Sequence, residues 1–126
     1  MKLIKEYMTP SPHSIVSTQN LQFALQKMHE LNVRHLPVME AGKLVGMLSE
    51  RDIRFIESYE KTDLESLRVN DAFSDDPYTV GPDASLKEVC QEMAERKIGS
   101  AIIVEKGQLL GIFTWIDALS VISKLI

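Results

Sequence analysis

The fold is decided by a stretch of sequence that occurs twice. The two copies read Gly46-Met47-Leu48-Ser49-Glu50-Arg51-Asp52-Ile53 and Gly111-Ile112-Phe113-Thr114-Trp115-Ile116-Asp117-Ala118. Each copy passes from apolar residues to a hydroxyl residue that is followed three places later by an aspartate. This is the spacing of a capping box, in which the two side chains cap the first turn of a helix. Each copy therefore predicts a strand that runs directly into a helix.

The two copies belong to a longer repeat with an offset of 65 residues, which aligns residues 8–53 with residues 73–118 without a gap. Two strand-like runs precede the capping box in each repeat. They cover residues 36–40 and 43–48 around Ala41-Gly42, and residues 101–105 and 108–113 around Lys106-Gly107. A short turn with glycine between two such runs predicts a β-hairpin.

A helix is expected before each hairpin. Short β-branched stretches at residues 14–17 and 79–80 lead to Thr18 and Asp83, which we take as N-caps. Apolar residues then recur at helical spacing, which predicts one buried face for each helix. These residues are Leu21, Ala24, Leu25, Met28 and Leu31 in the first repeat, and Leu86, Val89, Cys90, Met93 and Ala94 in the second. The buried side of the last helix of each repeat is expected to carry Ile53 and Ile56, or Ala118, Val121, Ile122 and Leu125.

The pattern predicts an α/β (α+β) fold made of two tandem β-α-β-β-α repeats. We expect repeat 1 at residues 1–60, a connector at residues 61–68 and repeat 2 at residues 69–126, with Leu64 and Leu67 anchoring the connector region. A unit of about 60 residues buries little apolar surface alone. The two repeats are therefore expected to pack with approximate two-fold symmetry into one compact module with two clefts between them.

Composition excludes several classes of protein. The chain has 126 residues, a net charge of −4 and 44% hydrophobic residues, which is typical of a globular domain. An acidic total argues against nucleic acid as a partner. No apolar run is long enough to cross a membrane, and charged residues stand where a signal peptide needs an apolar stretch, so we expect a cytoplasmic protein. The single cysteine, Cys90, forms no internal disulfide.

An enzyme is not expected. Cys90 occupies an apolar helical position, which favours a core thiol over a nucleophile. The three histidines show no metal-ligand spacing, and no glycine-rich phosphate loop is present. We therefore predict no catalytic residues and no metal site.

Several stretches together resemble the signature of CBS domains, which are named after cystathionine β-synthase. Besides the two capping-box stretches, they are Tyr7-Met8-Thr9-Pro10, Val33-Arg34-His35-Leu36-Pro37-Val38 and Lys97-Ile98-Gly99-Ser100-Ala101-Ile102-Ile103-Val104. The resemblance covers nearly the whole chain, which is therefore similar to a stand-alone CBS pair, or Bateman module. It implies a regulatory protein that binds AMP, ADP, ATP or S-adenosylmethionine in the clefts, alone or with Mg²⁺, and requires no cofactor. It also implies a disc-like homodimer that signals to a protein target.

The resemblance assigns residues to each cleft, and we call the two sets site 1 and site 2. Site 1 consists of Ser14, Ile15, Arg34, His35, Pro37, Ser49, Arg51 and Asp52, and site 2 of Thr79, Val80, Ser100, Ala101, Thr114 and Asp117. A hydroxyl, a carboxylate and free backbone N–H groups at a helix start are groups that bind ribose and phosphate. The apolar members are expected beside an adenine ring, although each is also a plain core residue.

The two sites differ in charge. Arg34, His35 and Arg51 supply site 1 with donors for a polyphosphate, whereas Gly99, Ser100 and Ile116 stand at the matching positions of site 2. We therefore expect site 2 to bind a ligand with less negative charge or none. Three alternatives stay open: the hydroxyl–aspartate pairs act only as helix caps, Trp115 contacts either a ligand or a dimer surface, and the protein is a dimeric interaction scaffold that binds no ligand.

Overall fold

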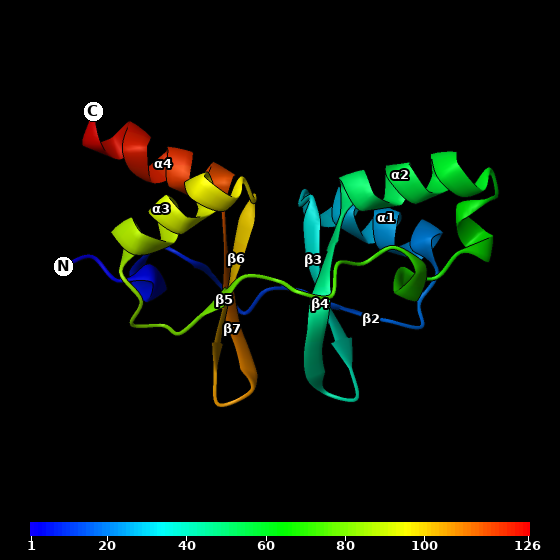
Figure 1. Cartoon of the computed structure of the whole chain (residues 1–126), viewed down its shortest axis with the longest axis horizontal. Helices are drawn as coiled ribbons and strands as arrows, with labels where there is room; N and C mark the ends of the chain where they lie inside the picture. The colour runs from blue at the N-terminus through cyan, green and yellow to red at the C-terminus, as the bar shows by residue number, and fades with distance from the viewer. The chain divides into compact units, whose positions relative to one another are not determined.

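The computed structural model describes residues 1–126 and divides them into two compact units. One unit is continuous, His13–Pro77, and we call it the central unit. The other combines Met1–Pro12 with Tyr78–Ile126, and we call it the composite unit. Each unit has a small sheet with helices packed on it (Figure 1). The mixed α/β fold with two tandem repeats is as the sequence predicts.

The central unit has a three-stranded sheet in the order β2-β3-β4. Strand β2 (Ile15–Val16) runs parallel to β3 (His35–Glu40), which forms an antiparallel hairpin with β4 (Lys43–Ser49). The helices are α1 (Leu21–Leu31) and α2 (Glu50–Glu60), with short 3₁₀ turns η2 (Leu64–Ser66) and η3 (Val69–Asp71). Both residues of the hairpin turn, Ala41 and Gly42, have positive φ. The predicted two-residue hairpin is confirmed, because this backbone matches the twist of paired strands.

The composite unit repeats this arrangement and adds one short strand. Its sheet has the order β1-β7-β6-β5, with the elements β1 (Thr9–Pro10), β5 (Thr79–Val80), β6 (Ser100–Glu105) and β7 (Gln108–Thr114). The helices are α3 (Leu86–Arg96) and α4 (Trp115–Leu125), and the 3₁₀ turn η1 (Ile4–Glu6) opens the chain. Strand β5 is parallel to β6, and β6 is antiparallel to β7.

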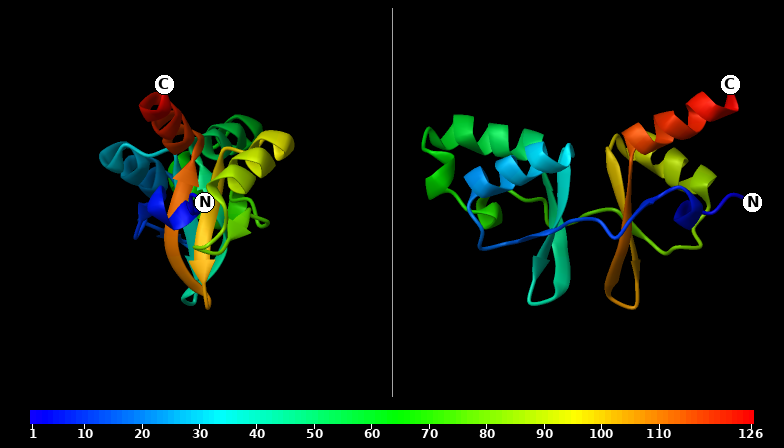
Figure 2. Two further views of the ribbon diagram at one scale, coloured as in Figure 1. Left: turned by 90° about the vertical axis from the view of Figure 1, so that its left-hand side faces the viewer. Right: turned by 180° about the vertical axis from the view of Figure 1, so that it is seen from behind.

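The first twelve residues complete the composite unit. Ile4 is fully buried among the side chains of that unit, and its N–H donates to the carbonyl oxygen of Ala84 at 2.8 Å. Figure 2 shows this N-terminal segment beside the start of α3. Val69 is fully buried in the central unit in the matching way, and its N–H donates to Gln19. Residues 1–12 and 69–77, which we call the leading segments, thus each pack with the helices and hairpin of the other repeat.

Two N-cap predictions are wrong. Helix α1 is capped by Asn20, whose Oδ1 accepts the N–H of Phe23 at 2.8 Å, and not by Thr18. Helix α3 is capped by Ser85, whose Oγ accepts the N–H of Glu88, and not by Asp83. The caps stand directly before Leu21 and Leu86, where the chain leaves the extended conformation. Thr18 and Asp83 are too far upstream to reach those N–H groups.

Of the residues predicted on buried faces, three are exposed, namely Ala94, Ile122 and Leu125, and the others are buried or partly buried. Ile53 is fully buried, and Leu64 and Leu67 are 6% and 8% exposed, so they anchor the connector region as expected. Ala94 is exposed on α3, and Cys90 is only partly buried. On α4, Ile122 and Leu125 are 49% and 67% exposed. This face of α4 is therefore exposed in the composite unit.

Candidate functional site

The predicted capping boxes form at the starts of α2 and α4. In the central unit, Asp52 Oδ2 accepts the N–H of Ser49 at 3.0 Å, and Ser49 Oγ accepts the N–H of Asp52 at 3.0 Å. In the composite unit, Asp117 Oδ2 accepts the N–H of Thr114 at 2.9 Å. In each box these hydrogen bonds use Oδ2, and the second carboxylate oxygen, Oδ1, has no protein partner. Both aspartates are partly buried, so each presents one free oxygen at a helix start that carries a partial positive charge.

The two boxes differ in the hydroxyl proton. Thr114 Oγ1 donates to Asp117 Oδ2 at 3.3 Å, so its proton is engaged within the box. The Ser49 hydroxyl accepts from Asp52 and donates to no protein atom. Site 1 therefore offers a hydroxyl donor that site 2 does not.

Strand pairing brings the polar residues of each site to one end of the hairpin. His35 faces Ser49 across the β3–β4 pair, and Ser100 faces Thr114 across the β6–β7 pair. The main chain adds a link at the same place, because the N–H of Glu50 donates to the carbonyl oxygen of Arg34 at 3.0 Å. The β3–β4 hairpin thus brings Arg34, His35, Ser49 and Asp52 together around the start of α2.

The apolar members of the sites are packed in the cores of their own units. Ile15 is 4% exposed within the hydrophobic cluster of the central unit, and Ala101 is fully buried in that of the composite unit. Pro37 is buried in β3, and Val80 is partly buried in β5. Ser14 is partly buried, and its carbonyl oxygen accepts from Lys27 Nζ at 2.6 Å, whereas Thr79 is exposed. Ile15, Ala101 and Val80 thus have the core role that the sequence left open beside the ligand role, whereas Ser14 and Thr79 do not.

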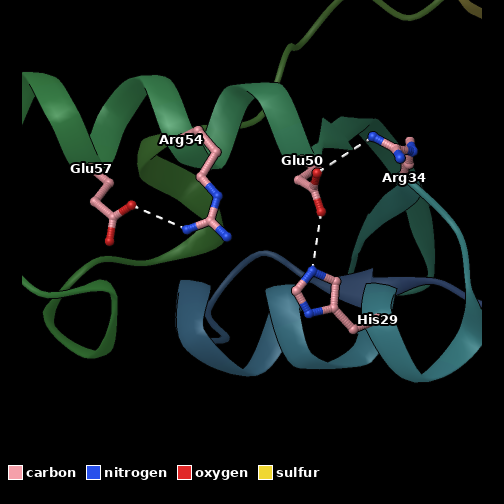
Figure 3. Close-up of polar contacts among 5 residues, drawn as sticks. All are labelled: His29, Arg34, Glu50, Arg54 and Glu57. Carbon is pink, nitrogen blue, oxygen red and sulfur yellow. Dashed lines mark hydrogen bonds and ion pairs between the residues drawn. The ribbon is translucent and has the colours of Figure 1, made fainter.

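Glu50 lies beside the predicted residues of site 1, although the sequence pattern does not indicate it. Its carboxylate lies 3.6 Å from Arg34 Nη1 and 3.2 Å from His29 Nε2. Figure 3 shows Glu50 between these two basic side chains. Figure 3 also shows that Arg54 pairs with Glu57 along α2. Arg51 is exposed and makes no ion pair. Arg34 is therefore held by a carboxylate here, whereas Arg51 is free to meet an anion. The only sequence signal for this pairing is an acidic residue beside two basic ones, which is common on protein surfaces.

His35 is the titratable group of site 1 with a shifted pKa. Burial lowers the pKa of His35 below 6.5, with Arg34 adding to the decrease and Asp52 opposing it. At pH values between this lower pKa and 6.5, His35 binds a proton in the unfolded chain but not in the folded chain. The contribution of His35 to stability is therefore complete above pH 6.5 and is lost as the pH falls through the folded pKa.

We expect the His35→Gln variant to lose less stability than the wild type when the pH falls below 6.5, because the neutral amide takes up no proton. Urea unfolding across a pH series measures this difference. The exposed His13 offers a matched control, His13→Gln, for the removal of an imidazole. Parallel pH profiles for wild type and His35→Gln would contradict the assignment.

The described residues form no metal cluster and show no activated cysteine. No group of three or more His, Cys, Asp or Glu side chains is placed to hold a metal ion. Burial raises the pKa of the Cys90 thiol, which disfavours the reactive thiolate. No helix is long and apolar enough to span a bilayer.

Comparison with known proteins identifies relatives over most of the chain. The chain is 32% identical over 112 residues to the CBS domain-containing protein YhcV of Bacillus subtilis, which covers 89% of this chain and 79% of that protein. It is 35% identical over 113 residues to an inosine-5′-monophosphate dehydrogenase of Korarchaeum cryptofilum, which covers 89% of this chain. This match spans only 21% of the dehydrogenase, so the similarity is confined to one part of that enzyme.

Solved structures share the whole fold. A protein assigned to acetoin utilization (AcuB) from Vibrio cholerae is 31% identical and superposes with a TM-score of 0.89, covering 99% of this chain and 93% of that one. A CBS domain pair in complex with 5′-methylthioadenosine and S-adenosyl-L-methionine is 21% identical, has a TM-score of 0.91 and covers 100% and 99% of the two chains. The family model for the CBS domain matches residues 4–58 and 69–124. The chain therefore belongs to the CBS-domain family and contains a tandem pair of these domains.

Proposed function

We propose that the chain is a regulatory sensor of adenosine-containing ligands such as AMP, ADP, ATP or S-adenosylmethionine. The observation that carries this proposal is the doubled capping box, in which Asp52 and Asp117 each keep one carboxylate oxygen without a protein partner. Capping uses one carboxylate oxygen of each aspartate, so the second oxygen is available to a ligand. A free oxygen at the same position of both repeats is suited to the two hydroxyl groups of a ribose.

The fold itself is compatible with such ligands, since a CBS pair of the same fold holds 5′-methylthioadenosine and S-adenosyl-L-methionine. The match to part of an inosine-5′-monophosphate dehydrogenase supports a regulatory role for the pair. Ligand binding regulates a target only if the ligand has different affinities for two conformations. The target of this chain is, in the proposal, another protein.

The two sites are proposed to prefer different ligands. Besides the Asp52 carboxylate, site 1 contains Arg51, Arg34 and the free hydroxyl proton of Ser49. These donors suit a polyphosphate. An incoming phosphate would compete with Glu50 for Arg34, so Arg34 would exchange one anion for another. Site 2 has no basic residue at the matching positions, which suits adenosine or S-adenosylmethionine.

We expect Asp52→Ala to weaken the binding of ATP by about 1 to 3 kcal/mol, or roughly 5- to 150-fold, because charge-assisted hydrogen bonds to the ribose are lost. Isothermal titration calorimetry with ATP measures the change. Asp52→Asn is the companion variant, since its amide oxygen still accepts the N–H of Ser49 and preserves the cap. It should also weaken binding.

Two controls separate ligand contact from helix capping. Asp71 caps the 3₁₀ turn η3 by accepting the N–H of Arg68 at 2.8 Å, so Asp71→Ala removes a capping carboxylate outside both sites. Asp117→Ala removes the carboxylate of site 2. Both variants should keep the ATP affinity of the wild type. Unchanged affinity in Asp52→Ala, or an equal loss in Asp71→Ala, would count against the ribose assignment.

We further propose that two copies of the chain associate through α4. Its exposed face carries Trp115, Ile116, Leu119, Ile122 and Leu125, each at least 49% exposed. Apart from the capping residue Asp117, α4 has one charged residue, Lys124. A second copy presents the same apolar face, and pairing the two would remove both from water.

Sedimentation equilibrium should therefore give about twice the 14.2 kDa of one chain. Leu119→Glu should shift the equilibrium to the monomer, because it places a charge in the apolar contact. The matched control is Ser120→Glu on the exposed surface of the same helix. A monomeric wild type would contradict the pairing. The same apolar face also supports the second candidate function, a dimeric scaffold that binds no ligand.

A further inference from the structure

The central unit has a pocket at the opposite end of its hairpin from site 1. The pocket has a volume of about 390 Å³ and is lined by Ser17, Thr18, Glu40, Arg68 and Asn70. Glu40 pairs with Lys43 beside the hairpin turn, whereas His35 pairs with Ser49 at the other end. Five residues of extended strand separate the two ends, or roughly 16 Å. The pocket is thus distinct from the predicted nucleotide site.

Ser17 contributes an unpartnered polar group to this pocket. The residue is 3% exposed and is the only buried polar residue of the chain. Its backbone is fully used, because its N–H donates to Met39 and its carbonyl oxygen accepts from Asn70. Its hydroxyl has no protein partner, yet no side-chain oxygen is wholly enclosed without one. The hydroxyl therefore opens to the pocket, and a buried hydroxyl of this kind is stabilised by a hydrogen-bonding ligand.

Two opposite charges line the pocket without forming ion pairs. Arg68 Nη1 donates only to the carbonyl oxygen of Thr18, at 3.4 Å, which leaves most of its guanidinium donors free. Glu40 has no salt bridge, and its carboxylate is exposed at the end of β3. A ligand with one anionic and one cationic group could match both.

The composite unit shows what fills the matching place there. The bridges Leu3↔Ser85 and Asn20↔Arg68 establish that the offset of 65 extends to the leading segments. Ser17, Thr18, Glu40 and Asn70 thus correspond to Pro82, Asp83, Glu105 and Lys5. Lys5 Nζ lies 3.0 Å from Asp83, and Glu105 is close enough to contribute to its raised pKa. An ammonium group of the chain itself therefore lies beside the matching acidic residues in the composite unit, whereas Asn70 supplies none in the central unit.

We propose that the pocket of the central unit binds a free α-amino acid. The ammonium group of the ligand takes the position that Lys5 fills in the other unit, next to Glu40 and the Ser17 hydroxyl. The carboxylate of the ligand binds the guanidinium of Arg68, which pairs well with planar anions. The polar lining formed by Thr18 and Asn70 favours a small polar side chain, and L-serine is the probe with which to begin.

The binding test is an NMR titration of the full chain with L-serine, ethanolamine and L-glycerate. Ethanolamine lacks the carboxylate of serine, and glycerate lacks the ammonium group. L-serine should cause saturable shifts of the Ser17, Thr18 and Asn70 amides, and each analogue should bind at least about tenfold more weakly. No saturable shift with L-serine, or equal binding of the three compounds, overturns the proposal.

Variants locate the binding and separate it from the nucleotide site. Glu40→Gln and Arg68→Gln should each weaken L-serine about tenfold or more, while the matched control Glu105→Gln leaves its affinity unchanged. The double variant Thr18→Asp/Asn70→Lys rebuilds the arrangement of the composite unit and should abolish binding, since the new ammonium fills the pocket. Asp52→Ala should leave L-serine binding unchanged, whatever its effect on ATP. Undiminished binding in the double variant would show that L-serine sits elsewhere.

Discussion

Ile4→Ala should destabilise the protein by about 2 to 5 kcal/mol, although Ile4 is the fourth residue of the chain. Residues so close to a terminus are ordinarily frayed and tolerant of change. Ile4 is instead fully buried, with 0% of its surface exposed, and packs with Leu86, Val89 and Phe113. Replacing it with alanine removes three carbon atoms from a closed core and leaves a cavity that its neighbours fill only in part.

Urea unfolding of the Ile4→Ala variant measures this loss. Lys2→Ala is the matched control in the same segment, because Lys2 is exposed, and its effect should stay within about 0.5 kcal/mol. Val69→Ala probes the equivalent position of the central unit, and it should be clearly destabilising too. An Ile4→Ala variant as stable as Lys2→Ala would show that the N-terminal segment does not complete the composite unit.

Gly46→Ala should cost about 3 kcal/mol or more, at the upper end of the range for overpacked cores. A Cβ atom at Gly46 would collide with the carbonyl oxygen of Ser74 and with the ring of Phe73. That carbonyl cannot easily move, because Ser74 and Met47 exchange two backbone hydrogen bonds of 2.9 and 3.0 Å. Strand β4 must therefore move away from Phe73 and Ser74 to make room for the methyl group.

Two other glycines serve as graded controls for Gly46→Ala. A Cβ at Gly111 would meet mainly the flexible side chain of Met8, along with the Thr9 carbonyl oxygen at 2.9 Å, so Gly111→Ala should cost less, about 1 kcal/mol. A Cβ at Gly81 would meet nothing within 4 Å, so Gly81→Ala should be neutral or slightly stabilising. Thermal unfolding ranks the three variants, and equal effects at Gly46 and Gly81 would contradict the close approach.

The features that the sequence predicts correctly are those set by neighbouring residues. The capping boxes at Ser49 and Thr114 depend on residues three places apart, and the Ala41-Gly42 hairpin depends on a two-residue turn. The buried face of α1 follows from helical spacing alone. Repetition with a fixed offset adds weight to each of these patterns, because both copies need the same local structure.

The features that the sequence does not predict depend on contacts between residues far apart in the chain. The burial of Ile4 requires knowledge that residues 1–12 pack with the second repeat rather than with the first. The pairing of Glu50 with Arg34 and His29 requires the relative placement of α1, α2 and the end of the hairpin. The pocket beside Ser17 likewise forms only when η3 lies against the ends of β2 and β3. The periodicity of the sequence does not predict any of these long-range contacts.

The central proposal is that the chain senses adenosine-containing ligands, and thermal unfolding tests it most directly. The protein should be unfolded alone and with AMP, ADP, ATP, S-adenosylmethionine and NADH, each with and without Mg²⁺. A ligand present at about 100 times its dissociation constant adds roughly 2.7 kcal/mol, which raises the Tm by several degrees for a domain of this size. We predict such a rise with at least one adenosine compound, reduced in Asp52→Ala or in Asp117→Ala. If none of the compounds raises the Tm, the chain is not an adenosine sensor, and the dimeric scaffold becomes the better account.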